Sequence, residues 1–81
     1  MRIRMGGYYL HESGNSILRV SMVVTFKSGV QQVSGRFVNR DGVVDNYACK
    51  RDDFLETFRA LPKKAALEQL TSWGVSEEVL E

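Results

Sequence analysis

The hydrophobic pattern changes its period once along the 81-residue chain, and this change limits the fold more than any other feature. Up to about residue 50, apolar side chains recur at every second position, which is typical of strands with one buried face. From residue 52 to residue 73 they recur at the spacing of a helix. Because the strands precede the helices instead of alternating with them, the sequence predicts an α+β fold.

Turns containing glycine divide the first part of the chain into expected strands. The clearest strand covers residues 17–26, and strands over residues 30–39 and 43–49 follow it. They are separated by turns at Lys27-Ser28-Gly29 and Asn39-Arg40-Asp41-Gly42. A weaker strand lies within residues 3–10, and Gly35 indicates a bulge or a close backbone approach. We therefore expect a sheet of four strands arranged as an antiparallel meander.

Two helices are expected after the strands. Asp53 stands at an N-cap position with Glu56 three residues later, which is the spacing of a capping box. This helix should end at Pro62, whose ring removes an amide donor. A second helix should run from Pro62 to Gly74, with one further turn after Ser76. We expect both helices to cover one face of the sheet, with a core of Val20, Met22, Val24, Phe54, Phe58, Leu67 and Leu70.

Length and charge limit the classes of protein that this chain can represent. A chain of 81 residues and 9.2 kDa supplies one hydrophobic core, so a single α+β domain over residues 1–81 is expected. The net charge of +1 argues against a strongly basic nucleic-acid binder and against an acidic mimic of DNA. No apolar run is long enough for a membrane span, and the first five residues lack the apolar block of a secretion signal. A cytoplasmic location is therefore expected.

Few residues in the sequence suggest catalysis or metal binding. Cys49 and His11 are the residues from which a nucleophile and its base would be built, but their positions favour a half-buried thiol and a surface imidazole. One cysteine and one histidine are too few for a structural zinc site, and no phosphate-binding glycine motif occurs. Asp41 and Asp45 are a weak carboxylate pair, because Asp41 precedes Gly42 in a turn. We expect neither enzyme activity nor a metal or cofactor.

Two groups of residues are candidates for contact with a partner. Tyr8 and Tyr9 are adjacent, so they should point to opposite faces of a strand and at least one should be exposed. Exposed tyrosines are frequent at interface hot spots. The second group is basic and gathers around the ends of the first expected helix: Lys50, Arg51, Arg59, Lys63 and Lys64. Such a group suits nucleic acid or an acidic protein surface, although solvated surface charge is the simpler interpretation.

The turns and the corner between the helices resemble those of a small phage anti-CRISPR family. The similar segments are Phe26-Lys27-Ser28-Gly29, Asn39-Arg40-Asp41-Gly42 and residues 54–62, which end in Leu61-Pro62. The family inhibits the type I-F system, and its founding member is a four-stranded sheet followed by two helices. The resemblance implies a stoichiometric, non-catalytic inhibitor. Such an inhibitor binds backbone subunits of the RNA-guided surveillance complex of the host bacterium and prevents target DNA from pairing with the guide.

The resemblance also implies which residues contact the partner. The family uses aromatic and acidic residues of its sheet, and its amino-terminal tyrosine corresponds to Tyr8 or Tyr9. Its tyrosine before the first hairpin turn corresponds to Phe26, which lacks the hydroxyl. Its acidic residue in the next strand corresponds to Phe37, which removes a charge-assisted contact, so another CRISPR subtype or another target fits as well. The expected partner-binding residues are Tyr8, Tyr9, Phe26, Arg59, Lys63 and Lys64.

Two other interpretations stay open. The chain could be a small nucleic-acid-binding regulatory protein of phage or mobile-element origin, which would use the basic residues and bind less tightly as salt rises. It could also form a homodimer through an edge strand, because an open sheet leaves two edges unpaired.

Overall fold

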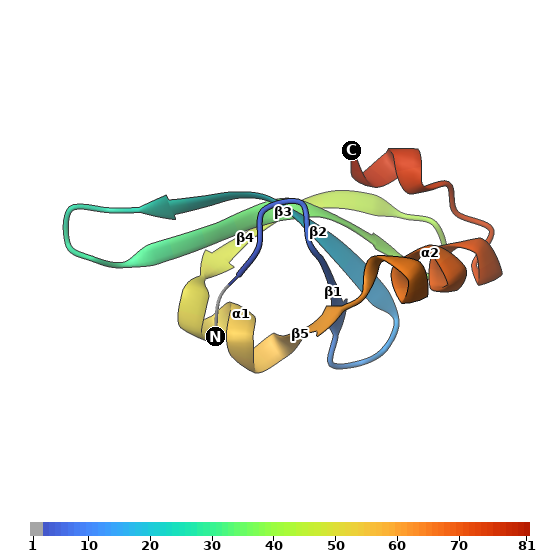
Figure 1. The fold of residues 1–81 in the computed structure, drawn as a ribbon, viewed down its shortest axis with the longest axis horizontal. Coiled ribbons are helices and arrows are strands. Elements are labelled where there is room, and N and C mark those ends of the chain that lie inside the picture. Colours follow the sequence, from blue (N-terminus) through green and yellow to red (C-terminus); the bar gives the residue numbers. More distant parts are fainter. Residues whose placement is uncertain (1–2) are drawn as a thin grey trace.

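The computed structural model describes residues 3–81, and the chain forms one antiparallel sheet with helices on both sides (Figure 1). Met1 and Arg2, which belong to the segment examined for a secretion signal, lie outside the described residues. The elements are β1 (Tyr8–His11), β2 (Ser16–Thr25), β3 (Gln31–Asn39), β4 (Val44–Lys50), α1 (Arg51–Thr57), β5 (Phe58–Leu61), α2 (Lys63–Ser72) and the 3-10 turn η1 (Glu77–Leu80). The expected α+β class, both glycine turns and the extra turn after Ser76 are confirmed.

Among residues 3–81 the sheet has five strands, so the expectation of four strands is wrong. Their order is β4-β3-β2-β1-β5, and the additional strand β5 covers residues that were expected to continue the first helix. That helix, α1, ends at Thr57, and β5 then pairs antiparallel with β1 from Tyr8 opposite Leu61 to His11 opposite Phe58. The pairing satisfies backbone groups of β1 that would otherwise form a bare edge. Long-range pairing therefore overrides the helical spacing of the apolar residues.

The start of α1 also differs from the expectation. Lys50 occupies the N-cap position and its side chain makes no capping hydrogen bond, so the predicted capping box of Asp53 and Glu56 is not formed. Asp52 and Asp53 lie in the first turn instead, where negative charge interacts favourably with the helix dipole. The last strand residue runs directly into the helix, which fixes where α1 lies relative to β4.

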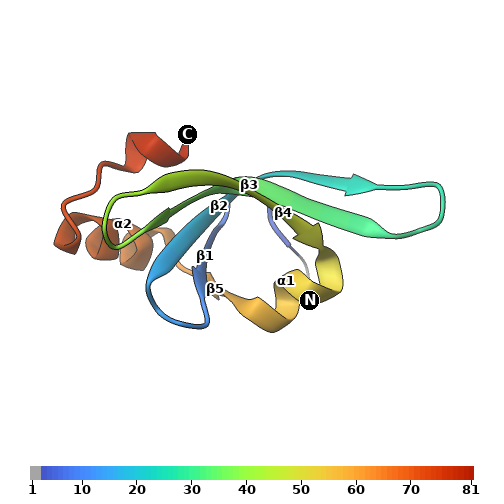
Figure 2. The same ribbon diagram turned by 180° about the vertical axis from the view of Figure 1, so that it is seen from behind.

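The helices pack against opposite faces of the sheet, so the expectation that both cover one face is wrong (Figures 1 and 2). One core cluster joins the sheet to α2 and η1 and consists of Tyr8, Ile17, Val38, Ala66, Leu70 and Leu80. The other joins the sheet to α1 and β5 and consists of Tyr9, Leu18, Val20, Val33, Phe54 and Phe58. Neighbouring strand residues therefore belong to different clusters, because alternate side chains point to opposite faces.

A β-bulge in β2 changes which residues face the core. Val20 lies opposite Gly35 but Met22 lies opposite Ser34, so Ser21 is an extra residue and the alternation shifts after it. Met22 is consequently 53 % exposed, and its expected place in the core is wrong. The expectation of a close approach at Gly35 is confirmed, since a Cβ there would lie 2.3 Å from the carbonyl oxygen of Arg19. Of the other expected core residues, Val20, Phe54, Phe58 and Leu70 are buried, and Val24 and Leu67 are half-buried.

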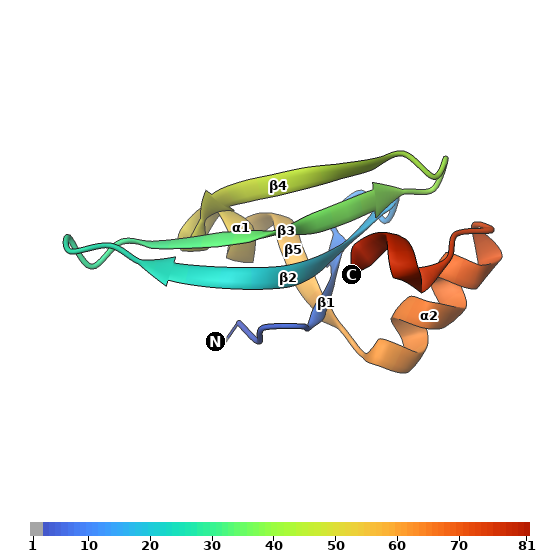
Figure 3. The same ribbon diagram turned by 90° about the horizontal axis from the view of Figure 1, so that it is seen from above.

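The hairpin of β2 and β3 projects from the body of the molecule (Figures 1 and 3). The molecule extends 41 Å along its longest axis and 19 Å along each of the other two. The last pair between β3 and β4 joins Gln32 to Lys50, and the hairpin continues beyond it. None of the helices in the described part of the chain packs on this distal part, and its side chains are correspondingly exposed from Thr25 to Val30.

Candidate protein-interaction surface

Exposed apolar side chains gather on the projecting hairpin. Met22, Phe26 and Val30 are 53 %, 48 % and 43 % exposed, and half-buried Val24 lies between the first two. Met22, Val24 and Phe26 are alternate residues after the bulge, so they share one face, and Phe26 is joined across the hairpin to Val30. We name these four residues the hairpin strip. Single exposed apolar residues are ordinary, whereas a contiguous strip indicates a binding surface.

The turn at the tip holds the end of the strip in place. The amide of Phe26 donates to the Val30 carbonyl at 2.9 Å, and the amide of Gly29 donates to the Phe26 carbonyl at 2.9 Å. Gly29 has a φ of 90°, which a residue with a side chain rarely adopts, so glycine is needed there. The Gln31 side chain also donates to the Thr25 hydroxyl at 3.1 Å on the other face of the hairpin. The strip is thus presented by an ordered hairpin, and ordering it on binding costs little entropy.

Tyr8 and Tyr9 are not part of an exposed interaction surface. They point to opposite faces as expected, but their exposed fractions are only 5 % and 4 %, so the expectation that one of them is exposed is wrong. Each ring enters a different core cluster, because both faces of the sheet are covered. The Tyr9 hydroxyl accepts a hydrogen bond from the Arg4 amide at 3.0 Å, and the Arg19 guanidinium lies 5.4 Å from the centre of the Tyr8 ring. While the fold is intact, neither ring offers contact area to a partner.

The basic residues are divided between two places. Arg59 on β5 and Lys63 and Lys64 at the start of α2 are exposed and stand close together along the chain. Lys50 and Arg51 lie at the junction of β4 and α1, with the whole of α1 between them and β5. The five residues expected to form one basic patch are therefore separated into two groups. Near Lys63, a hollow is lined mainly by residues 4–9 and 60–63.

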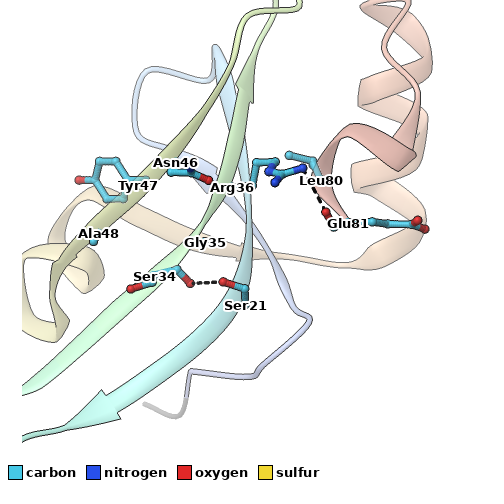
Figure 4. A pocket seen from close by; sticks show the side chains of 9 residues that line it. All are labelled: Ser21, Ser34, Gly35, Arg36, Asn46, Tyr47, Ala48, Leu80 and Glu81. Atoms are coloured by element: carbon cyan, nitrogen blue, oxygen red, sulfur yellow. Dashed lines mark hydrogen bonds between the residues drawn. The ribbon is translucent and has the colours of Figure 1, made fainter.

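A second hollow lies on the sheet face beside η1 (Figure 4). It is floored by small or polar residues of three strands, among them Ser34, Asn46 and Ala48. The Arg36 guanidinium donates to the carbonyl oxygen of Glu81 at 3.2 Å (Figure 4) and also to that of Val79 at 3.5 Å. Its guanidinium therefore holds the carboxy-terminal turn against the sheet.

The residues considered for catalysis are not brought together. His11 is on β1 and Cys49 is on β4, with β2 and β3 between these strands in the sheet. The His11 ring lies against Phe58, and its Nδ1 accepts a hydrogen bond from the Ser13 amide at 3.1 Å, so the imidazole is part of a turn. Burial raises the pKa of the Cys49 thiol, which outweighs the lowering effect of its hydrogen bond with Tyr47. The thiol thus stays protonated at neutral pH.

The carboxylates are likewise explained by local structure. In the second turn the side chain that bonds to the backbone is that of Asn39, whose Oδ1 accepts from the amides of Asp41 and Val43 at 3.0 Å. Asp45 accepts from the amide of Asn46 at 2.8 Å. Asp41 lies in the turn, as the sequence predicts. The side chain that bonds to the turn backbone, however, is that of Asn39.

Sequence reasoning missed Met22 and Val30 as surface residues. The single available signal was Gly35, because a glycine inside a strand often marks a bulge on the neighbouring strand. A bulge placed at Ser21 would have moved Met22 from the core face to the outside. Phe26 was the one member of the strip among the expected partner-binding residues, and its exposure agrees with that role.

No group of three or more potential metal ligands occurs among residues 3–81. In the same part of the chain, no helix is long and apolar enough to cross a membrane. Comparisons with protein-family models, with curated proteins and with solved structures found no match.

Proposed function

We propose that this protein is a stoichiometric protein-binding inhibitor of phage origin that acts in the host bacterial cytoplasm on an RNA-guided CRISPR surveillance complex. The observation that carries the protein-binding part is the hairpin strip, in which Met22, Phe26 and Val30 are exposed together on one projecting element. The CRISPR part depends on the resemblance of the two turns and the segment of residues 54–62. Phe26 belongs to both arguments, because the resemblance places a partner-contacting aromatic residue at this position.

In this proposal, binding of the inhibitor blocks the surface on which target DNA pairs with the guide. The hairpin strip docks into an apolar recess between backbone subunits of the complex. A net charge of +1 suits obstruction by shape, since imitation of DNA would require strong negative charge. Aromatic residues at the centre of an interface contribute most of its affinity, because a large rigid side chain loses little entropy on binding.

The test uses purified surveillance complexes of several CRISPR subtypes. Binding is measured by biolayer interferometry, and inhibition is measured as loss of target-DNA binding in a gel shift. Phe26→Ala should weaken binding roughly 5- to 30-fold, which corresponds to about 1–2 kcal/mol for a central aromatic residue. The matched control is Val43→Ala, because Val43 is 60 % exposed but lies in the turn between β3 and β4, away from the hairpin strip. The affinity of the Val43→Ala variant should stay within about twofold of the wild-type affinity.

Two results would contradict the proposal. If no complex of any subtype binds, the CRISPR assignment is wrong. If a complex binds but Phe26→Ala and Val43→Ala behave alike, the hairpin strip is not the contact surface. Both variants should keep the far-ultraviolet circular dichroism of the wild type, because neither residue belongs to a core cluster.

A second candidate function is that of a small nucleic-acid-binding regulator. The observation that favours it is the exposed group of Arg59, Lys63 and Lys64 on consecutive elements. Replacement of all three by glutamine should abolish a gel shift at low salt, and the wild-type shift should disappear as salt rises. A shift at low salt that is lost both in the triple variant and as salt rises would favour this function over protein binding.

A further inference from the structure

The outer edge of β2 is paired along only part of its length. β1 pairs with Ile17, Leu18 and Arg19, and the segment before β1 continues the contact for one more residue. There the Gly6 amide donates to the Val20 carbonyl at 2.7 Å, and the Val20 amide donates to Gly7 at 3.0 Å. From Ser21 to Thr25, no described residue pairs with this edge. Figure 3 shows this distal half of β2 along the border of the sheet.

Backbone groups on this part of β2 point away from the sheet. The amide of Phe26 donates to the Val30 carbonyl at 2.9 Å, so the backbone groups of Phe26 point toward β3. Along an antiparallel strand, the backbone N–H and C=O groups of successive residues point alternately to the neighbouring strand on one side and on the other. Val24 and Met22 therefore also bond to β3, whereas the amide and carbonyl groups of Val23 and Thr25 point to the open edge. These two residues are able to form a new ladder with another strand.

The sequence of the open edge favours addition of a strand. Residues 21–26 read Ser-Met-Val-Val-Thr-Phe, which contains β-branched and apolar residues but no charge, glycine or proline. Native edge strands are usually protected by charges, proline or bulges, because unprotected edges pair with other chains. The bulge at Ser21 lies at the start of the open segment, and the pairing of β2 with β3 is regular beyond it, from Met22 to Thr25. The other long edge, β4, carries both Asp45 and Lys50 and is protected in this sense. The distal half of β2 is thus the less protected of the two edges.

We propose that a second copy of this chain pairs antiparallel with the open edge of β2 and forms a twofold-symmetric dimer. Because Val23 and Thr25 provide the free backbone groups, Val23 of each copy bonds to Thr25 of the other. Val24 then lies on the twofold axis and faces Val24 of the partner copy. On the same face, Met22 of each copy lies opposite Phe26 of the other, so the two side chains contact each other laterally while the face of the hairpin strip stays open.

The shape of the edge favours a second copy over an unrelated strand. The open segment is short, about 17 Å for five residues. It ends where Gly6 and Gly7 are hydrogen-bonded to the backbone of Val20, and we call this point the step. In the proposed register the hairpin tip of each copy ends at this step of the other copy, so both open segments are used fully. A register shifted by two residues towards the step would place Phe26 opposite Val20, whose backbone is already bonded. No like charges meet within residues 22–26, because none are present.

The dimer is expected to be weak and to depend on concentration, since five residues per strand bury less area than a stable interface. Sedimentation equilibrium from micromolar to millimolar protein should show the average mass rising above the 9.2 kDa of the monomer. Val24→Lys or Val24→Glu alone should reduce the association constant at least tenfold, because two like charges meet on the axis. An equimolar mixture of the two variants should restore association, because opposite charges then face each other.

The matched control is Ala48→Lys, which places a lysine at an exposed position on the β4 edge. It should associate like the wild type. The inference is overturned if the wild type is monomeric at millimolar concentration, if the mixed variants fail to associate, or if Ala48→Lys is the variant that loses the dimer. Thermal unfolding of each variant by circular dichroism verifies that the charge at half-buried Val24 leaves the chain folded.

A cysteine cross-link provides a second measurement that does not depend on charge. In a Cys49→Ser background, Val24→Cys places two thiols opposite each other at a position where the side chains of facing strands are closest. Mild oxidation should give a disulfide-linked dimer severalfold faster than for Ala48→Cys in the same background. Equal rates would overturn the inference.

Self-association is measured with this protein alone, so it stands or fails separately from the proposed inhibition. A monomer that still inhibits a surveillance complex would refute the dimer but not the proposed function. A dimer without any effect on surveillance complexes would refute the proposed function but not the dimer.

Discussion

Replacement of Gly35 by alanine tests the close approach of β2 and β3 on which the bulge depends. A Cβ at this position would lie 2.3 Å from the Arg19 carbonyl oxygen and 3.0 Å from its carbonyl carbon, and both are backbone atoms that cannot rotate away. The strands would have to separate by about 1 Å to restore a normal contact. Overpacking of this kind costs about 1–3 kcal/mol, and a weakened ladder hydrogen bond adds about 1 kcal/mol.

Part of this cost is offset in the unfolded chain. Alanine has less conformational freedom than glycine, which favours the folded state by about 0.4–1 kcal/mol where the backbone conformation is allowed. Gly35 is not in the left-handed region, so this benefit applies. The net loss should be roughly 2–3 kcal/mol, against a total free energy of unfolding of about 4–12 kcal/mol for a chain of this length.

Urea unfolding followed by circular dichroism measures this loss, and the midpoint of thermal unfolding should fall by roughly 10–20 °C. Ser34→Ala is the control, because Ser34 is adjacent on β3 but contributes its backbone carbonyl, not its side chain, to the bond with Ser21. It should change the free energy of unfolding by less than about 0.5 kcal/mol. If Gly35→Ala were as stable as wild type, the tight approach at Arg19 would be wrong.

Three further predictions concern other parts of the molecule. Phe58→Ala should cost about 3–5 kcal/mol in urea unfolding, because Phe58 is buried and stacks on Phe54 with ring centres 5.0 Å apart; a cost below about 1 kcal/mol would contradict its place in the core. Arg36→Ala should release η1, seen as faster amide hydrogen exchange in residues 77–81 with little change elsewhere, whereas unchanged exchange would show that Arg36 does not hold this turn. Burial raises the pKa of the Cys49 thiol, so iodoacetamide should react with the folded protein only at higher pH than with the urea-unfolded chain. Because the unfolded thiol ionises first, stability should fall as pH rises above the usual thiol pKa of about 8.5. Cys49→Ser should reduce this slope and leave the part at higher pH that comes from Tyr47, whose pKa burial also raises; identical alkylation profiles would refute the assignment.

Local signals in the sequence were sufficient for the parts of the fold that depend on near neighbours. The alternation of apolar residues and the positive φ values of Gly29 and Gly42 define the β2–β3 and β3–β4 hairpins, because a turn and the strands beside it are determined within about ten residues. The same holds for α2, which begins after Pro62 and is followed by Gly74 with a φ of 73°.

The candidate site was predictable only in part. Phe26 was named because the family resemblance implies a partner-contacting aromatic residue before the first glycine turn, not because the residue pattern predicted its exposure. Met22 could not be named, because its exposure depends on one extra residue in β2 that is accommodated by the glycine on β3. Tyr8 and Tyr9 were misplaced for the related reason that the number of covered sheet faces is not visible in the alternation of a single strand.

The sequence by itself determined the α+β class, the hairpins and part of the core, namely Val20, Phe54, Phe58 and Leu70. These follow from backbone sterics and from the burial of apolar side chains at regular spacing. Only the tertiary structure decided that residues 58–61 form a strand, that α1 and α2 lie on opposite faces, and that the distal edge of β2 stays open. Each of these depends on backbone hydrogen bonds between residues far apart in the chain. The helical spacing of Phe58 and Leu61 favours a helix less strongly than the hydrogen-bonded pairing of their backbone with β1 favours a strand.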